Sequence, residues 1–275
     1  MRKNFHQDHD GGAVLDLRCA AARRAIHLPD LPELSPEARQ MAIRTWRGRM
    51  INEHISAQVW SALVGQLLRA AIPPELLAGV AEAVSDELRH AELCAAVVEA
   101  LGGTAVARLP PIEDVPDHSD VGALEGVLRN VISVGCMSET VAVAVIRTEQ
   151  AELDGTALGE VLSSILADEV SHARLGWKLL GACAPLLDAG TKQRLSAYLV
   201  DALAHQIEHE VPMLPILGAV DPNAAAAGVC DGGFARSVFL DTIEQVIVPG
   251  LERAGLSASE AWARAQARTA SLLVA

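Results

Sequence analysis

Two copies of one short pattern carry residues able to do chemistry in this chain of 275 residues. Each copy reads Glu-x-x-His, as Glu87 with His90 and as Glu169 with His172. Residues three positions apart lie on the same face of a helix, so each Glu can act together with its His. An acid and an imidazole on one helix face can serve as a pair of metal ligands.

Glu53 and Glu139 resemble these pairs in one respect, because each interrupts a helix stripe that is otherwise apolar or small. Four carboxylates in a dry core cannot all stay ionised unless cations accompany them. Two divalent ions would balance the four charges, and two neutral imidazoles would complete their ligand shells. Oxygen-rich ligation with one imidazole per metal suits Fe(II) or Mn(II) better than zinc or copper. The six residues are therefore candidate ligands of a two-metal site.

Four long helices are expected to carry these residues. Their apolar positions recur at alternating steps of three and four, which is the seam of a left-handed helical bundle. Ser35 and Pro36 predict the start of the first helix, and Pro73 and Pro74 predict its end. No period-two alternation is long enough for a sheet, so the fold class is predicted to be all-α. The next three helices are expected over about 75–101, 121–152 and 156–187.

The connection over 103–120 is long and rich in proline. Fully extended, it would reach about 60 Å at ~3.3 Å per residue. A helix of some 30 residues is about 45 Å long, so this connection is able to run the length of the bundle. The other connections are short and join antiparallel neighbours. We therefore expect a four-helix bundle with one long crossover between its second and third helices.

Three segments follow from this pattern. Residues 1–35 form an N-terminal leader, 36–188 form the bundle, and 189–275 form C-terminal helices that pack on it. A helix over about 191–210 has only one narrow apolar stripe and therefore needs a neighbour. Beyond it we expect an Ala/Gly-rich loop over 218–233 and terminal helices over 235–253 and 258–272.

The order E…E-x-x-H…E…E-x-x-H resembles that of the ferritin-like di-iron carboxylate superfamily, over about 40–187. The resemblance implies a ferritin-like bundle with two iron ions, manganese being possible, and O2 as co-substrate. It implies that Glu53, Glu87 and His90 hold one ion. The second ion would be held by Glu139, Glu169 and His172, with Glu87 and Glu169 as bridges.

Departures from individual families narrow the resemblance. Ferritins usually lack the second Glu-x-x-His, which disfavours simple iron storage. Rubrerythrins carry a Glu at the position that is Ala142 here. Radical-storing ribonucleotide reductase subunits carry a Tyr at the position of Cys94, and arylamine oxygenases carry a His at the position of Ile165. The wide gap between the second and third helices is similar to that in desaturases and aldehyde-deformylating oxygenases. The resemblance thus implies an oxidase or oxygenase with an external electron donor and leaves its substrate unassigned. The apolar, Ala-rich surroundings of the six residues suit a small apolar or acyl-type substrate.

Two other functions remain open. A ferroxidase or peroxide-scavenging protein would need no organic substrate, and a blind or very narrow cavity above the metals would favour it. A non-enzymatic helical protein would use the metals only for structure, and a cluster inert to O2 would favour that function.

Further residues are candidates for supporting roles. Asp86 and Asp168 each stand four residues before a motif His and are expected to orient an imidazole by accepting its Nδ1–H; the alternative is a solvated helix acid. Gly135 and Cys94 are candidates for a pocket beside the metals. For Gly135, close helix packing is the equal alternative.

His205 and His209 belong to the string HQIEH, which matches a zinc-peptidase pattern. With no third ligand in view, the simpler interpretation is a polar helix face. The alternative is that the helix covers the metals and that one of these histidines serves as an extra ligand or proton donor.

Composition limits the choice of partners and compartment. A net charge of −13 argues against nucleic acid, including the tRNA bound by one hydroxylase of this superfamily, and against anionic membranes. Five scattered cysteines without a C-x-x-C motif, and a polar N-terminus, favour a reduced cytoplasmic protein. No run of about 18 apolar residues predicts a membrane span. A homodimer is possible.

Overall fold

Helices dominate the structure, a computed structural model that describes residues 13–111, 114–214 and 220–273. The protein is 77% helix and 3% strand, which confirms the all-α class. Two strands of three residues each, β1 (Val14–Asp16) and β2 (Val106–Arg108), form an antiparallel pair. Sequence periodicity does not predict this pair, because three residues are too few to show a period-two alternation.

Four long helical segments carry the apolar stripes. The first is α2 (Pro36–Arg69), where the Ser35 hydroxyl accepts a hydrogen bond from the amide of Ala38 as an N-cap. The second is α3 (Pro74–Ala100), which ends before Gly102, a residue with a φ of +82°. The third comprises α4 (Ala123–Val131), a π-helical turn η1 (Ile132–Ser138) and α5 (Glu139–Glu152). The fourth is α6 (Ala157–Cys183), extended by the 3-10 turn η2 (Ala184–Leu186).

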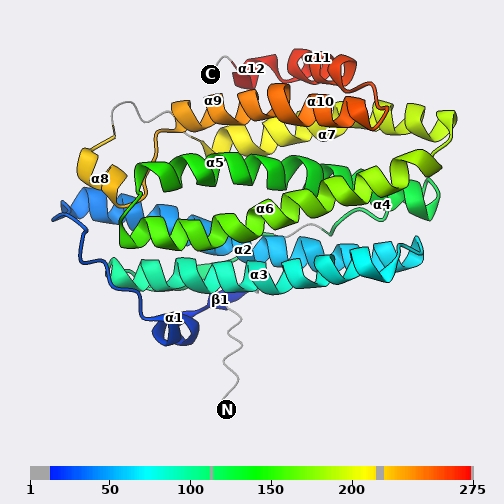
Figure 1. The fold of residues 1–275 in the computed structure, drawn as a ribbon. Helices are drawn as coiled ribbons and strands as arrows, with labels where there is room; N and C mark the ends of the chain where they lie inside the picture. The colour runs from blue at the N-terminus through cyan, green and yellow to red at the C-terminus, as the bar shows by residue number, and fades with distance from the viewer. Residues whose placement is uncertain (1–12, 112–113, 215–219, 274–275) are drawn as a thin grey trace.

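The four segments lie side by side (Figure 1). Helix α2 packs along α3 and α5 packs along α6, while α3 and α6 join the two pairs. The crossover lies against α2 and α4. There the carbonyl oxygen of Pro116 accepts hydrogen bonds from Gln66 at 3.2 Å and from Asn130 at 2.7 Å.

Buried apolar side chains form two clusters along these helices. On α2, Met50 belongs to one cluster and Trp60 to the other; on α6, Ile165 and Leu179 divide in the same way. On α3, the residues before the Glu-x-x-His motif join one cluster and those after it join the other. The polar interruptions of these three helices therefore lie in a layer between two regions that exclude water.

The last third of the described chain forms a further helical layer, at the top of Figure 1. Helix α7 (Ala189–Met213) contacts α4, η1 and α11 (Ala258–Arg268), and α9 (Gly232–Thr242) contacts α5. The expected 218–233 loop contains a short helix, and its first two residues lie outside the described part. The remaining elements are α8 (Pro222–Ala226), the π-helical turn η3 (Ile243–Ile247), α10 (Val248–Arg253) and α12 (Ala270–Leu273).

At the other end of the chain, α1 (Arg18–Arg24) packs on α3, where Arg24 pairs with Glu92 at 2.9 Å. One stretch among the described helices, Ala123–Glu152, is long and apolar enough to cross a membrane, with a mean hydropathy of 1.5. Of the most apolar 18-residue window in this stretch, 44% is buried inside the protein. The absence of a membrane partner stays a prediction.

Candidate metal centre

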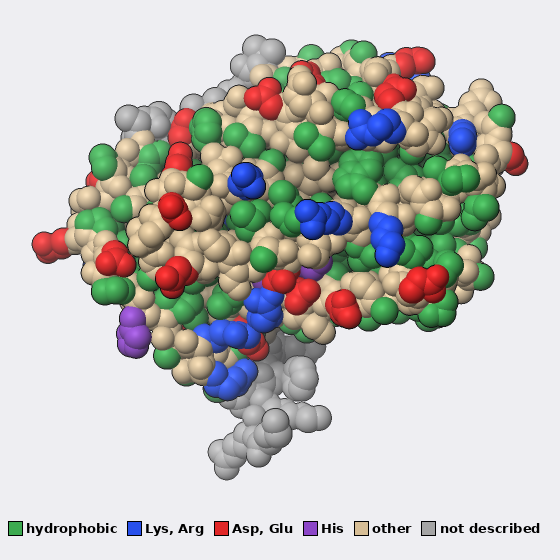
Figure 2. All heavy atoms as spheres, viewed as in Figure 1, with side chains coloured by type: hydrophobic (Ala, Val, Ile, Leu, Met, Phe, Trp, Pro, Cys, Tyr) green, Lys and Arg blue, Asp and Glu red, His purple; other side chains and the backbone are tan. Residues whose placement is uncertain are grey.

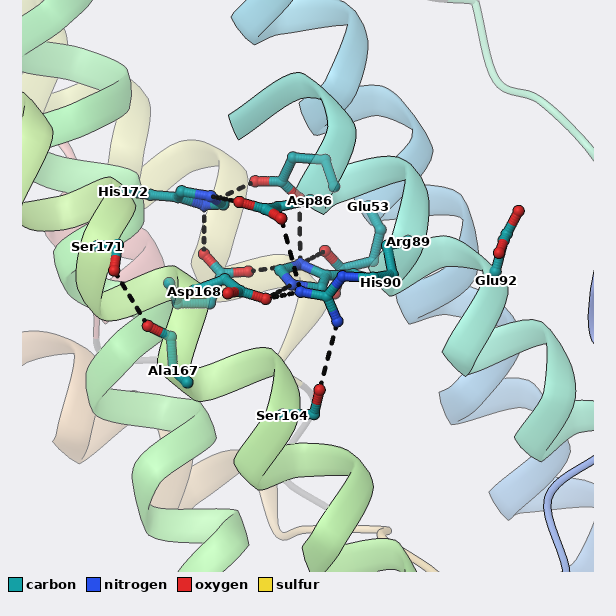
Figure 3. A network of polar contacts seen from close by, with 12 residues as sticks. Glu53, Asp86, Arg89, His90, Glu92, Ser164, Ala167, Asp168, Ser171 and His172 are labelled. Carbon is teal, nitrogen blue, oxygen red and sulfur yellow. Dashed lines mark hydrogen bonds and ion pairs between the residues drawn. The ribbon is translucent and has the colours of Figure 1, made fainter. Parts of the chain in front are cut away.

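The six sequence-predicted ligand residues converge in the layer between the two apolar clusters. They come from α2, α3, α5 and α6. In Figure 3, Glu53 of α2, His90 of α3 and His172 of α6 point toward one another. Their ligand atoms form two groups, and within each group all atoms lie within 4.8 Å of one another. One group is Glu53, Glu87, His90 and Glu169, and the other is Glu87, Glu139, Glu169 and His172.

Five of the six side chains are almost completely withdrawn from solvent. Glu87 is 1% exposed and His90 0%, and the other ligand candidates of α5 and α6 are at most 4% exposed. Glu53 is the exception, since its side chain keeps 14% exposure. Burying several ionisable groups without cations or protons is costly, so this arrangement demands neutralisation.

The imidazole of His90 faces the carboxylates through Nδ1. This atom lies 3.2 Å from Glu169 Oε1, 3.5 Å from Glu53 Oε2 and 3.7 Å from Glu87 Oε2. Yet His90 Nδ1 and Glu87 Oε2 are buried without a hydrogen-bond partner in the described part of the chain. Buried polar atoms are normally satisfied, so these two are suited to a cation that both would ligate.

His172 repeats the arrangement in the second group. Its Nδ1 lies 3.3 Å from Glu87 Oε1, 3.4 Å from Glu169 Oε2 and 3.8 Å from Glu139 Oε2. This nitrogen too is buried and without a hydrogen-bond partner among the described residues. Each group thus offers carboxylate oxygens with one imidazole nitrogen, so a buried metal ion fits the residues present.

Without a metal, protons neutralise the cluster. Burial by itself lowers the pKa of both histidines, but the carboxylates close to each Nδ1, Glu169 first, outweigh it and raise the pKa of His90 to about 11 and of His172 to about 9. Burial raises the pKa of Glu53 to about 8 and that of Glu139 well above its ordinary value. Burial by itself would raise the pKa of Glu169, but its close contacts with His172 and His90 outweigh burial and lower that pKa.

Asp86 and Asp168 contact the imidazoles in a crossed arrangement (Figure 3). Asp168 Oδ2 lies 3.0 Å from Nε2 of His90, and Asp86 Oδ2 lies 3.4 Å from Nε2 of His172. Each acid therefore contacts a motif imidazole as expected, but through Nε2 and not through the expected Nδ1. Nδ1 points into the ligand group, which leaves Nε2 for an acid on the neighbouring helix. Arg89 contacts Asp168 closely and lies 3.6 Å from Asp86, so it joins the two acids.

Trp60 of α2 also contacts the cluster. In the sequence it occupies an apolar position of the helix, so it could not be distinguished from an ordinary core residue. Its indole Nε1–H donates to Glu139 Oε1 at 3.0 Å, and its ring centroid lies 6.0 Å from that of His172. The contact occupies one carboxylate oxygen of Glu139 and leaves the other, Oε2, toward His172. A tryptophan on the stripe of a ligand helix was the only sequence signal for this role.

Gly135 serves helix packing rather than a pocket. A Cβ atom at this position would lie 2.7 Å from the Cα of Gly176 on α6, so the two backbones touch and leave no space for a ligand. Cys94 is fully buried within the apolar cluster of Met50 and Ile165. Neither residue lines the cavities described below, so the pocket expected beside them is not found there.

His205 and His209 do not reach the cluster. Both side chains are exposed on α7, their ring centroids are 6.1 Å apart, and His209 contacts its neighbour Glu210 at 3.2 Å. The idea of an extra ligand or proton donor from this pair is therefore wrong, and the polar-face interpretation holds. The buried polar residue of this helical turn is Gln206.

Two cavities in the described part of the chain border no candidate ligand. One of about 10 Å³ lies between α5 and α9, beside Glu149 and Cys230. The other, of about 40 Å³, lies between Leu28 and Leu158. A single water needs some 10–15 Å³, so both are small.

Comparison with known protein families and with curated proteins finds no match to this chain.

Proposed function

We propose that this protein is a non-haem di-iron oxidoreductase that uses O2 to oxidise a small apolar or acyl-type substrate. The observation that carries the proposal is the pair of buried Glu/His groups that share Glu87 and Glu169. Two metals that share bridging carboxylates form one redox unit, whereas a single structural ion would need only one group. The proposal includes a ferritin-like bundle as the fold that presents the ligands.

In this proposal Glu53 and His90 belong to one iron, and Glu139 and His172 belong to the other. Glu87 and Glu169 contribute to both. Two reduced iron ions bound here would supply the electrons that O2 needs for its reduction. Manganese fits the same oxygen and imidazole donors.

The chain's own residues prepare the site for that chemistry. Asp168 and Asp86 accept Nε2–H of the two imidazoles, which directs each Nδ1 at the metal position, where a bound metal would displace the Nδ1 proton. Trp60 restrains Glu139 through its indole hydrogen bond. The apolar clusters on either side exclude water, so the site stays dry while a substrate is oxidised.

Metal content is the first test. Protein produced in iron-rich medium should contain about two Fe or Mn ions per chain by elemental analysis. Glu87→Ala should lose both, because Glu87 belongs to both groups. Glu82→Ala is the matched control, since Glu82 is exposed on the same helix. One zinc ion per chain, unchanged in Glu87→Ala, would overturn the metal site.

Reaction with O2 is the second test. The Fe(II)-loaded protein, mixed with O2 in a stopped-flow spectrometer, should consume O2 and show a transient visible absorption before the diferric state. Glu87→Ala should not react, whereas Glu82→Ala should react like the parent protein. A loaded protein that is inert to O2 for hours would favour metals with a purely structural role.

A second candidate is a ferroxidase or peroxide-scavenging protein without organic substrate. Both cavities are small and neither is lined by a candidate ligand, which favours it. Excess Fe(II) distinguishes the candidates: a ferroxidase should oxidise many equivalents in repeated turnovers. An oxygenase should stop after its two ions unless reductant and an acyl or apolar substrate are added.

The partners belong to the same proposal. An oxygenase needs an external electron donor as well as its small-molecule substrate. Cytoplasmic location and a possible homodimer stay predictions. On the face seen in Figure 2, basic side chains stand among acidic and apolar ones. This mixture and the net charge of −13 argue against nucleic acid and against an anionic membrane as partner.

A further inference from the structure

The π-helical turn η1 ends at a ligand residue. The backbone N–H of Glu139 donates to the carbonyl oxygen of Val134, five residues earlier, whereas an α-helix would use the residue four earlier. The extra residue sets the direction in which the Glu139 side chain leaves the helix. In the last residue of the turn, the Ser138 hydroxyl donates to the carbonyl oxygen of Ser133 at 3.1 Å.

A side chain from α7, outside the four-helix segments, joins this turn. Gln206 is 6% exposed, on a helix face that is otherwise formed by Leu199, Leu203 and Ile207. Its Nε2 donates to Ser138 Oγ at 2.8 Å and to the carbonyl oxygen of Ser133 at 3.4 Å. That carbonyl can only accept, so the amide nitrogen, not the oxygen, must face the turn.

A second residue of α7 touches the same turn. The hydroxyl of Tyr198 lies 2.9 Å from the hydroxyl of Ser133. Tyr198 and Gln206 stand eight residues apart on one helix, so they contact η1 from the same side. Burying a polar amide in an apolar face is unfavourable unless it makes hydrogen bonds. The bonds of Nε2 are made with the turn beside Glu139, whereas Oε1 is buried without a partner among the described residues.

We propose that Gln206 is a positioning residue for the metal centre, which acts by holding the π-helical turn that orients Glu139. Tyr198 assists at the other end of the contact. The proposal rests on metal binding by the Glu/His cluster, and it gives the C-terminal third of the chain a direct role in that site. Loss of the Gln206 contacts lets the turn relax, so Glu139 no longer faces Glu169 and His172.

The test uses Gln206→Met, which keeps the side-chain volume and removes the hydrogen bonds. The control is His205→Ala, the exposed neighbour on α7. Titration of the full-length apoprotein with Co(II) should resolve two binding steps. Glu139→Gln should remove one binding step and Glu53→Gln the other. Gln206→Met should weaken Co(II) affinity about tenfold or more at the step that depends on Glu139, and should leave the affinity of the step that depends on Glu53 unchanged. The visible spectrum of Co(II) at the weakened step should change.

Amide hydrogen exchange of the apoprotein provides a readout that needs no metal. Exchange of residues 132–140 should accelerate in Gln206→Met and in Ser138→Ala, and should stay as in the parent protein in His205→Ala. Unchanged exchange and unchanged Co(II) binding in Gln206→Met would overturn the proposal, as would an equal loss of both binding steps. If the parent protein binds no Co(II), the metal centre fails, and exchange alone then decides the role of Gln206.

Discussion

Glu87 and Glu169 are the residues on which both ligand groups depend. Each carries two carboxylate oxygens, and for both residues one oxygen faces His90 while the other faces His172. A carboxylate placed this way can bridge two cations about 3.5–4 Å apart, the spacing usual in two-metal sites. The histidines, in contrast, each belong to one group, which allows the two metal positions to be perturbed separately.

The crossed contacts of Asp86 and Asp168 lead to a reciprocal prediction. Asp168→Asn should weaken, by about 10–100-fold, the Co(II) binding step that His90→Ala removes. Asp86→Asn should weaken by a similar factor the step that His172→Ala removes, because each acid holds the imidazole of the other helix. Each variant is the control for the other in chelator competition titrations. The opposite assignment would show that each acid serves its own helix.

Metal binding should strengthen as the pH rises. His90, His172 and Glu53 have pKa values raised to about 11, 9 and 8, so at pH 7 the metal-free protein holds a proton on each. A metal must displace these protons, and each proton released adds a factor of about ten in affinity per pH unit. Affinity should therefore rise at least about tenfold per unit between about pH 6 and 8.

Isothermal titration of the apoprotein with Co(II), in buffers of different ionisation enthalpy, measures the protons released. The matched comparison is His172→Ala, which should release fewer. An affinity that does not vary between pH 6 and 8 would contradict protonation of the ligands in the metal-free protein.

Helices position the ligands through two backbone features near η1. The π-helical turn sets the direction of Glu139, and the contact of Gly135 with Gly176 sets the separation of this turn from α6. Gly176 stands four residues after His172, so it belongs to the face of α6 that carries the ligands. The distance between Glu139 and the α6 ligands therefore depends on two residues without side chains.

Gly176→Ala should be destabilising, because its Cβ would overlap the backbone of Gly135. The expected loss is about 1–3 kcal/mol in the free energy of unfolding. Gly181→Ala, on the same helix with open space around it, should be neutral or stabilising by up to about 1 kcal/mol. Urea unfolding followed by circular dichroism measures both. Equal stability of the two variants would mean that α6 and η1 separate at no cost.

At the scale of the whole molecule, the C-terminal third completes both apolar clusters. Leu195, Leu199 and Leu203 of α7 are fully buried in the cluster that contains Trp60. Residues of the α8 region join the other cluster, where the carbonyl oxygen of Ala227 accepts the indole N–H of Trp46 at 2.9 Å. Removing this third would expose apolar surface on both sides of the Glu/His layer.

Limited proteolysis tests this dependence. Under native conditions, 191–210 should stay associated with the rest of the chain, because three fully buried leucines hold α7 in place. Mass spectrometry of the digest should therefore show no early release of a fragment near 36–188. Release of such a fragment, folded and with its full metal content, would show that the bundle does not need its C-terminal helices.

Much of the fold could be predicted from local patterns. Ser35, Pro36 and the paired prolines at 73 and 74 predicted the ends of α2 and the start of α3, since caps and prolines act within one helical turn. The Glu-x-x-His spacing predicted which residues gather, because a helix face is a property of sequence alone. The all-α class follows from the same periodicity.

Tertiary structure decided what depends on distance between helices. Asp86 and Asp168 exchange partners because α3 and α6 lie side by side with both Nδ1 atoms turned inward, a relation no single helix encodes. Gly135 packs instead of opening a pocket because Gly176, 41 positions away in the printed sequence, meets it. Local periodicity showed neither the π-helical turn before Glu139 nor the buried Gln206 that contacts it. Spacing along one helix determines a face, whereas only packing determines what that face meets.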